Sequence, residues 1–202
     1  GILTPSRTFT IISDLVQHTC LPIEMHTHND FGLAVANALS GLEAGATSVN
    51  TTVMGIGERA GNASFEQTLM ALSHLYHEKR EYDSTILKFL AKTVAKASKL
   101  SLPPNMPIVG RRLFSHESGI HADGMLKSKH AYEPFSPECV SGKRTFPIGK
   151  HSGSATLAYH LRHHPQKPSK HELQNLLPSI RDMVLEKKRP LSIKELTTLY
   201  HS

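Results

Sequence analysis

The sequence has little of what marks secreted, disulfide-rich or membrane proteins. Its only two cysteines, Cys20 and Cys139, lie far apart without metal or redox spacing, so we interpret them as reduced thiols. No apolar run reaches the length of a membrane span, and the first residues do not form a signal-peptide pattern. These absences exclude a disulfide scaffold and predict a cytoplasmic protein with no membrane partner.

Aromatic residues are also scarce, at 6% of the 202 residues, although the formal net charge is +6. A nucleic-acid interface would combine clustered basic side chains with aromatic ones. Here the basic residues are scattered, and the densest cluster is 186–190 in an expected tail helix. We therefore predict a solvated basic face, able to attract dicarboxylates or CoA phosphates, and no nucleic-acid partner.

A histidine pair stands at the end of a predicted strand. The apolar run 21–25 reads as a buried strand that continues into His26 and His28. Side chains two apart on a strand share a face, so both imidazoles would project together. Together with oxygen ligands they could hold one divalent cation. A chance pair is the alternative, since the chain has 14 histidines.

The segments after the histidines alternate between helical and strand patterns. Residues 31–44 have apolar side chains at helical spacing, and residues 48–54 are rich in Val and Thr, as strands are. A second helical pattern spans 63–76, with Ser64 or Asn62 available as its cap. This alternation predicts an α/β fold with a parallel sheet, whose ligands sit at the carboxyl ends of the strands.

A glycine-rich turn, Gly55 to Asn62, follows the second predicted strand at that same edge. Its glycines permit a sharp turn and a close backbone approach. Glu58 and Arg59 within it could fix each other or bind a ligand carboxylate. Taken alone, the turn is better explained as an ordinary tight loop that carries a solvated ion pair. Beside the histidines, it indicates a ligand site.

The rest of the chain is predicted to be mostly helical. Thr4 would cap a helix that begins at Pro5 and runs to about Thr19. Further helices are expected at 82–100, from near His116 with Ser115 as its cap, at 154–163 and at 170–186.

Five separated motifs then point, in the same order, to one family. They are HTHNDFGLAVANALSGLEAGAT, GIGERAGNASFEQ, FSHESGIHADGMLK, AYEPFSPECVSG and IGKHSGSATLAYHL. The motifs closely resemble the homocitrate synthase and 2-isopropylmalate synthase family, which condenses acetyl-CoA with a 2-oxo acid on a metal-centred TIM barrel. The resemblance implies the carboxy-terminal portion of a TIM (β/α)8 barrel, with its last two strands and their helices, followed by a small, mostly helical subdomain.

Within this family the sequence is most similar to nitrogenase-associated homocitrate synthases. Asn62 directly after Gly61, the short tail and the closing segment LLPSIRDMVLEKKRPLSIKELTTLY carry this likeness. A long leucine-sensing regulatory domain has no room here, which favours homocitrate formation from 2-oxoglutarate. Formation of 2-isopropylmalate or citramalate is the alternative, because those enzymes share every motif.

The resemblance also implies a metal site. His26 and His28 would be ligands from the seventh barrel strand, and Asn62 a further ligand or a close neighbour of the metal. The family's acidic ligand on the first strand has no counterpart here, and a barrel needs eight strands, so we expect a fragment or a split-enzyme half with a separate amino-terminal half. Mg, Mn, Zn and Co all suit such donors. Arg59 would position Glu58 or bind a substrate carboxylate.

In the helical part the resemblance implies that His121 and Tyr132 are catalytic. They would form an acid–base pair on a lid-like subdomain that reaches over the neighbouring subunit's barrel, which implies a homodimer with lid exchange. His116 and Glu117 are weaker candidates for the same site. The motif at 149–153 is expected to be a structural turn.

These expectations divide the chain into three parts. Residues 1–78 would belong to the barrel, 79–147 to the lid-like subdomain and 148–202 to a second small helical subdomain. Two rival functions stay open. A metal-dependent TIM-class hydrolase also uses His-x-His, but typically after the first strand and without GIGERAGN. A non-catalytic assembly half would need a separate partner chain.

Overall fold

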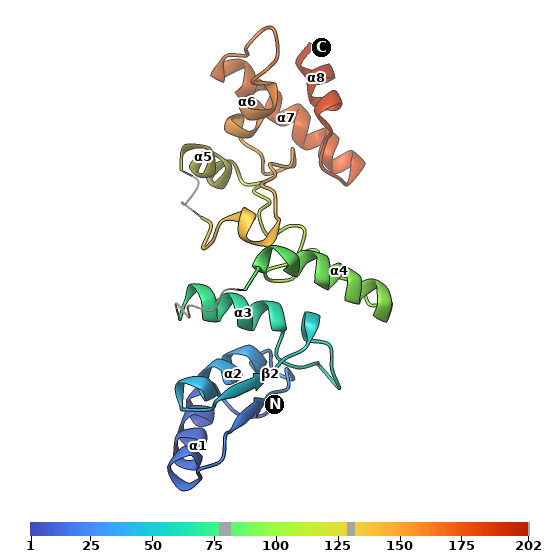
Figure 1. Ribbon diagram of the computed structural model, residues 1–202. Coiled ribbons are helices and arrows are strands. Elements are labelled where there is room, and N and C mark those ends of the chain that lie inside the picture. The colour runs from blue at the N-terminus through green and yellow to red at the C-terminus, as the bar shows by residue number, and fades with distance from the viewer. Residues whose placement is uncertain (77–81, 129–131, 202) are drawn as a thin grey trace. The chain divides into compact units, whose positions relative to one another are not determined.

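The computed structural model describes residues 1–76, 82–128 and 132–201 (Figure 1). Within these residues the chain forms two compact units. Unit 1 comprises residues 1–113 with 139–141, and unit 2 comprises 114–138 with 142–202. The predicted three-part division differs from these units and stays a prediction. Its first border falls within 77–81, outside the described residues.

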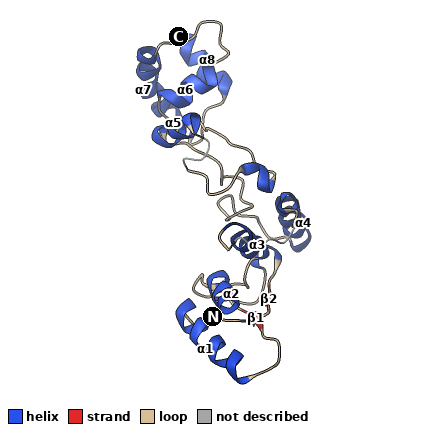
Figure 2. Cartoon of the chain, turned by 60° about the vertical axis from the view of Figure 1, so that its left-hand side comes forward, coloured by secondary structure: helices blue, strands red, loops and turns tan. Residues whose placement is uncertain are grey.

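Unit 1 contains a two-stranded parallel sheet with helices beside it. Strand β1 (Glu24–His26) pairs with β2 (Ser48–Asn50), and His26 lies opposite Asn50 (Figure 2). Helix α1 (Pro5–His18) begins as predicted, with the Thr4 side chain accepting a hydrogen bond at its start. Helix α2 (Ala34–Glu43) connects the two strands, as the alternating pattern predicted.

Both strands are shorter than the sequence predicts. Leu21 is 76% exposed, so the expected buried strand does not include it. At the other strand, residues 53–55 form a short 3-10 helix, η1 (Val53–Gly55), rather than a continuation of β2. The cause is local, because Met54 adopts a left-handed backbone with φ 60°, which no strand can contain.

The face of β1 opposite the histidines is packed into a core. Met25 is 6% exposed and packs with Ile12, Ala44 and Ala46. Gly41 of α2 makes this possible, since a Cβ there would lie 2.3 Å from the Met25 sulfur. Burial of Met25 on one face directs its neighbour His26 to the other face.

Two further helices complete the regular structure of unit 1. Helix α3 (Phe65–His74) is capped by Ser64, one of the two predicted caps. The expected helix at 82–100 begins as a 3-10 turn, η2 (Ser84–Ile86), and continues as α4 (Leu87–Ser98). The proline-rich segment that follows α4 has no regular structure.

Unit 2 is mostly helical, as predicted. Its helices are α5 (Gly119–Lys127), α6 (Ser154–Leu161), α7 (Lys170–Lys187) and α8 (Ile193–His201). A short 3-10 helix, η3 (Pro137–Val140), has its first two residues in unit 2 and its last two in unit 1. Leu157, Ile180 and Leu196 are fully buried and join α6, α7 and α8 in one core.

For unit 2 one prediction is wrong and one helix was missed. No helix begins near His116, because Ser115 pairs with Thr145 in a β-bridge and the helix starts only at Gly119. Helix α8 was not predicted as a separate element. Its signal is present, since Ser192 and Glu195 form the reciprocal hydrogen bonds of a helix start. No helix in the described ranges is long and apolar enough to cross a membrane.

Candidate functional site

The two predicted metal ligands lie side by side at the end of β1. The His26 and His28 ring centroids are 4.9 Å apart, with the ring planes nearly perpendicular. His26 Nδ1 lies 3.2 Å from Asn50 Oδ1, a contact that the strand register brings about. Because the amide oxygen can only accept, this contact favours the tautomer with the proton on Nδ1, in which Nε2 is the atom that can bind a ligand. Asn50 was not predicted to take part.

Asn62, the third predicted ligand, is also at this place. Residues 28 and 62 form an antiparallel β-bridge, although 33 residues separate them in the chain. His28 Nδ1 and Asn62 Oδ1 are both buried, and neither has a hydrogen-bond partner. Buried polar atoms are nearly always paired, so these two atoms on bridged residues are available to a group that binds there.

The backbone of the glycine-rich turn fixes Asn62. Its N–H donates to the Gly55 carbonyl at 2.9 Å, and the Gly61 carbonyl accepts from Asn29 N–H at the same distance. Gly61 has φ +92°, and a Cβ there would lie 2.1 Å from the Gly55 oxygen. Only glycine fits, so this predicted turn is a required part of the site's geometry.

Glu66 holds the start of the turn and was missed by the sequence analysis. Its side chain is 0% exposed. Both carboxylate oxygens accept the Met54 N–H at 3.0 Å, and one also accepts the Ser64 hydroxyl at 2.8 Å. The carboxylate therefore fixes the left-handed residue that turns the chain away from β2. The available signal was an acidic residue in the first turn of a helix, close to a glycine-rich loop.

Arg59 pairs with Asp30 rather than with Glu58, the partner that the sequence suggested. Its Nε donates to Asp30 Oδ1 at 2.8 Å and its Nη2 to Oδ2 at 3.3 Å. The hydrogen bonds from Arg59 hold the pKa of the Asp30 carboxyl well below its usual range. Asp30 thus joins the end of the histidine segment to the glycine-rich turn. Glu58 is exposed beside Arg59.

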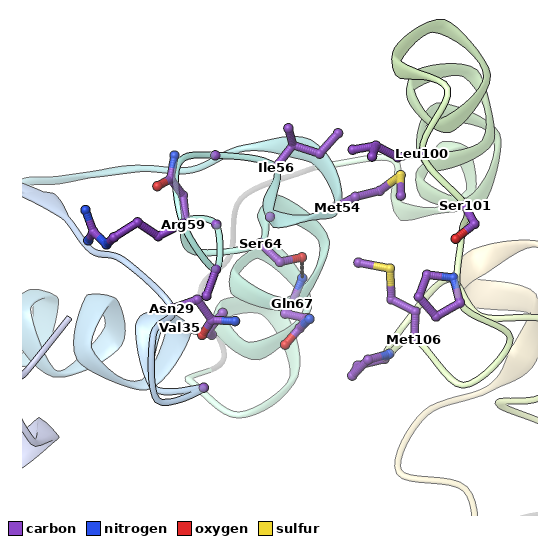
Figure 3. Close-up of a pocket in the computed structure, with 18 of the residues that line it drawn as sticks. Asn29, Val35, Met54, Ile56, Arg59, Ser64, Gln67, Leu100, Ser101 and Met106 are labelled. Atoms are coloured by element: carbon purple, nitrogen blue, oxygen red, sulfur yellow. Dashed lines mark hydrogen bonds between the residues drawn. The ribbon is translucent and has the colours of Figure 1, made fainter.

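A pocket of about 830 Å³ opens beside this turn (Figure 3). The turn itself, with Asn29 and Arg59, forms one wall. Leu100, Ser101 and Met106, from the segment after α4, form the opposite wall. The pocket has the volume that a small organic ligand needs, and it reaches Asn62.

The predicted catalytic pair is brought together in unit 2. The His121 ring, on α5, and the Tyr132 ring have centroids 4.6 Å apart and planes inclined by 41°. Gly124 leaves room for this contact, since a Cβ there would lie 2.6 Å from the Tyr132 ring. Both side chains are exposed, Tyr132 by 48%.

The two weaker candidates have different surroundings. His116 lies behind the pair, where burial lowers the pKa of its imidazole while the nearby Glu133 carboxylate acts in the opposite direction. Glu117 accepts a hydrogen bond from His151 N–H at 3.4 Å and packs against Gly149. It therefore supports the turn at 149–153, which was expected to be structural.

The donors of unit 1 fit part of a metal site. Among the residues that the structure describes, no three His, Cys, Asp or Glu side chains could hold a metal. Two imidazoles and the Asn62 amide oxygen supply two nitrogen donors and one oxygen donor, and the unpaired atoms face no other partner. Such a set suits a divalent ion that receives a further oxygen ligand from elsewhere.

Comparisons with known proteins place the chain in a family. An HMGL-like family model, of a TIM-barrel family, matches residues 1–94, and a homocitrate synthase post-HMGL domain-like model matches residues 108–188. The chain is 45% identical over 199 residues to "Homocitrate synthase 1" of Nostoc sp., which covers 98% of this chain and 53% of that protein.

Two further relatives carry other names. The chain is 45% identical over 200 residues to "2-isopropylmalate synthase 2" of Caldanaerobacter subterraneus subsp. tengcongensis, covering 99% of the chain and 52% of the relative. Over 157 residues it is 48% identical to a Methanothermobacter thermautotrophicus protein named for (R)-citramalate synthesis, covering 78% of the chain and 32% of the relative. The chain spans about half the length of the first two relatives. The part that matches the third relative is 32% of that protein.

Proposed function

Because the chain belongs to the homocitrate synthase and 2-isopropylmalate synthase family, we propose that it is the carboxy-terminal part of a TIM-barrel acyltransferase. The enzyme would condense acetyl-CoA with a 2-oxo acid. The observation that carries this proposal is the pair of unpaired buried atoms on His28 and Asn62, beside the oriented imidazole of His26.

These three residues are proposed to hold a divalent metal, for which Mg, Mn, Zn and Co are all suitable. When bound, the metal would act as a Lewis acid on the keto group of the 2-oxo acid. The Asn50 contact orients His26 for this role, and the bridge between residues 28 and 62 keeps the other two donors together. The remaining acidic ligand would come from a barrel half upstream.

His121 and Tyr132 are proposed to move protons in the condensation. One of them takes a proton from the methyl group of acetyl-CoA, whose carbon then bonds to the keto carbon of the 2-oxo acid. The developing alkoxide gains a proton, and water cleaves the thioester and releases CoA. The close ring contact supports this assignment, since it places both candidate acid–base side chains at one place in unit 2.

Arg59 and Glu58 are proposed to bind substrate. Asp30 occupies Nε and Nη2 of Arg59, which leaves Nη1 for a substrate carboxylate. Asp30 would at the same time fix the direction of the guanidinium group. Glu58, exposed beside it, would contribute polar contacts at the same edge.

The catalytic pair is proposed to complete the active site of a second subunit. Exposed acid–base residues work poorly in open water, and both His121 and Tyr132 are exposed in this chain. A homodimer that exchanges its lids would cover them with the partner's barrel. Pairing with a separate amino-terminal half is also part of the proposal, because the chain spans only about half of its relatives.

We propose 2-oxoglutarate as the 2-oxo acid, with homocitrate as the product and a role in nitrogen fixation or amino-acid biosynthesis. The relative from Nostoc sp. supports this choice by its name. The relatives named for 2-isopropylmalate and citramalate make 2-oxoisovalerate and pyruvate the alternatives.

One assay tests the proposal. The chain is joined to the matching upstream barrel half, and CoA release from acetyl-CoA is measured with 2-oxoglutarate, 2-oxoisovalerate and pyruvate in parallel. Preference for 2-oxoglutarate is expected. Preference for another of these acids would keep the reaction and change the product. If no acid gives CoA release although metal is bound, the condensation is refuted, and a hydrolase or a non-catalytic assembly half takes its place.

A further inference from the structure

A buried ion cluster lies directly behind the catalytic pair of unit 2. Glu133 follows Tyr132 in the chain, and its side chain is only 3% exposed. Arg144 donates from Nε to Glu133 Oε1 at 2.9 Å and from Nη2 to Oε2 at 2.7 Å. On its other side, His116 Nε2 lies 3.7 Å from Glu133 Oε1, with the His116 side chain 11% exposed.

Two paired segments of the backbone hold this cluster. The His116 N–H donates to the Thr145 carbonyl at 2.9 Å, and the Thr145 N–H donates to the Phe114 carbonyl at 2.9 Å. Arg144 and His116 are therefore presented by adjacent backbones, although 27 residues separate them in sequence. A buried carboxylate is strongly unfavourable without such partners, so Glu133 has one favourable position.

That position determines where Tyr132 lies. The Tyr132 ring is 48% exposed, so burial contributes little to holding it. On one side it rests on α5, against His121 and above Gly124. The next residue in the chain is fixed by the two-point contact with Arg144. Adjacent residues share a backbone, so a fixed Glu133 restricts the reach of the Tyr132 side chain.

We infer that Glu133, held by Arg144, is a positioning residue that keeps Tyr132 against His121. The inference rests on the proposed function, because only that function makes the contact between Tyr132 and His121 important for catalysis. The contact itself is a property of the chain and can be measured without activity.

Glu138 supplies a matched control. It also contacts Arg144, from Oε1 to Nη1 at 3.4 Å, but its side chain is 71% exposed. Glu133→Gln keeps the size of the side chain, removes its charge and puts an amide donor toward the Arg144 donors. Glu138→Gln makes the same chemical change at the rim of the same cluster. The comparison therefore separates the buried carboxylate from general charge effects around Arg144.

The first measurement uses the chain alone. Ring-to-ring NMR contacts between His121 and Tyr132 are recorded in the wild type and in both variants. We expect the contact to be lost in Glu133→Gln and retained in Glu138→Gln. If Glu133→Gln fails to fold, Arg144→Lys takes its place, because lysine keeps the charge but lacks the fork that holds both oxygens. A retained contact in a folded Glu133→Gln or Arg144→Lys protein would overturn the inference.

The second measurement uses the enzyme joined to its upstream barrel half. We expect Glu133→Gln to lower kcat by roughly tenfold or more, with KM for the 2-oxo acid and metal content nearly unchanged. Glu138→Gln should stay within about twofold of the wild type. If Tyr132→Phe retains full activity, the proposed role of Tyr132 fails, whereas the NMR contact still decides whether Glu133 positions it. If Tyr132→Phe loses activity and Glu133→Gln does not, the positioning role is refuted.

Discussion

The two candidate centres of this chain are assembled in different ways. In unit 1, His26, His28 and Asn62 lie at the ends of successive strands, and backbone hydrogen bonds fix them. In unit 2, His121 and Tyr132 meet through a short helix and a loop that side-chain ions hold. The first centre follows from local rules of β-α-β structure, whereas the second depends on contacts between distant segments.

This difference also affects how each centre tolerates change. The turn in unit 1 has no space for a Cβ at Gly61, so its shape is set by sterics and by φ. The loop in unit 2 is held by charged groups whose effect depends on protonation and on exact partners. We therefore expect the centre in unit 1 to be disrupted by substitutions that change the backbone geometry of the turn. The centre in unit 2 should be disrupted by substitutions that remove a charge.

The largest effect is expected from His28→Ala in the enzyme joined to its upstream barrel half. Loss of a ligand should lower metal affinity and turnover by at least about 100-fold. The metal content of the purified protein and the rate of CoA release measure this. His18→Ala is the matched control, because His18 is exposed on α1 and should change neither. Normal metal content and rate in His28→Ala would refute the ligand assignment.

Tyr132→Phe should have the next largest effect. Removal of a proton-transferring hydroxyl is expected to lower kcat by roughly 100-fold, while binding of the 2-oxo acid stays nearly normal. The ring is retained, so its contact with His121 should persist. Steady-state kinetics with a separate binding titration distinguish the two effects. A loss confined to binding would argue against a catalytic role.

A smaller effect is expected from Gly61→Ala in the isolated chain. The new Cβ would lie 2.1 Å from the Gly55 oxygen, so the turn must shift, and we expect the free energy of unfolding to fall by about 1–3 kcal/mol. Gly32→Ala is the control, since Gly32 also has a positive φ, +74°, but no atom within 4 Å of the added carbon. Urea denaturation of both variants checks the difference. Equal losses would show that the close approach at Gly61 is unimportant.

The smallest effect concerns pH. Burial lowers the pKa of His116 below its ordinary value of 6.5, against the opposing influence of Glu133. As the pH falls below 6.5, His116 takes up a proton in the unfolded chain before it does so in the folded chain. The folded state therefore loses stability from pH 6.5 downwards, until the pH falls below the lower pKa that His116 has in the folded chain. His116→Gln should therefore flatten the decline in melting temperature between neutral and mildly acidic pH. An unchanged decline in melting temperature would contradict a lowered pKa for His116 in the folded chain.

The sequence predicted much of unit 1 because its rules are local. Alternating patterns indicated the strands and helices, and the His-x-His spacing predicted that two imidazoles project together, as they do at the end of β1. The strand ends were wrong, since a left-handed residue at Met54 cannot be read from propensity. Glu66 and Asp30 were missed because their roles depend on which backbone donors and cations lie beside them in space.

In unit 2 the family resemblance predicted more than the residues did. Nothing in the spacing of His121 and Tyr132 indicates a contact, and the resemblance alone paired them. The Glu133, Arg144 and His116 cluster escaped prediction, because it requires the pairing of Ser115 with Thr145. An isolated bridge of this kind has no periodic pattern in the sequence.

The most direct test of the account is a crystal structure of the chain, joined to its upstream barrel half, with Mn or Co and a 2-oxo acid. Anomalous scattering then locates the metal. We expect one ion bonded to nitrogen atoms of His26 and His28 at about 2.0–2.2 Å, with Asn62 beside it and the 2-oxo acid bound to it. An ion found elsewhere, with the imidazoles of both histidines free of metal, would contradict the claim that this chain carries half of a condensing enzyme's metal centre.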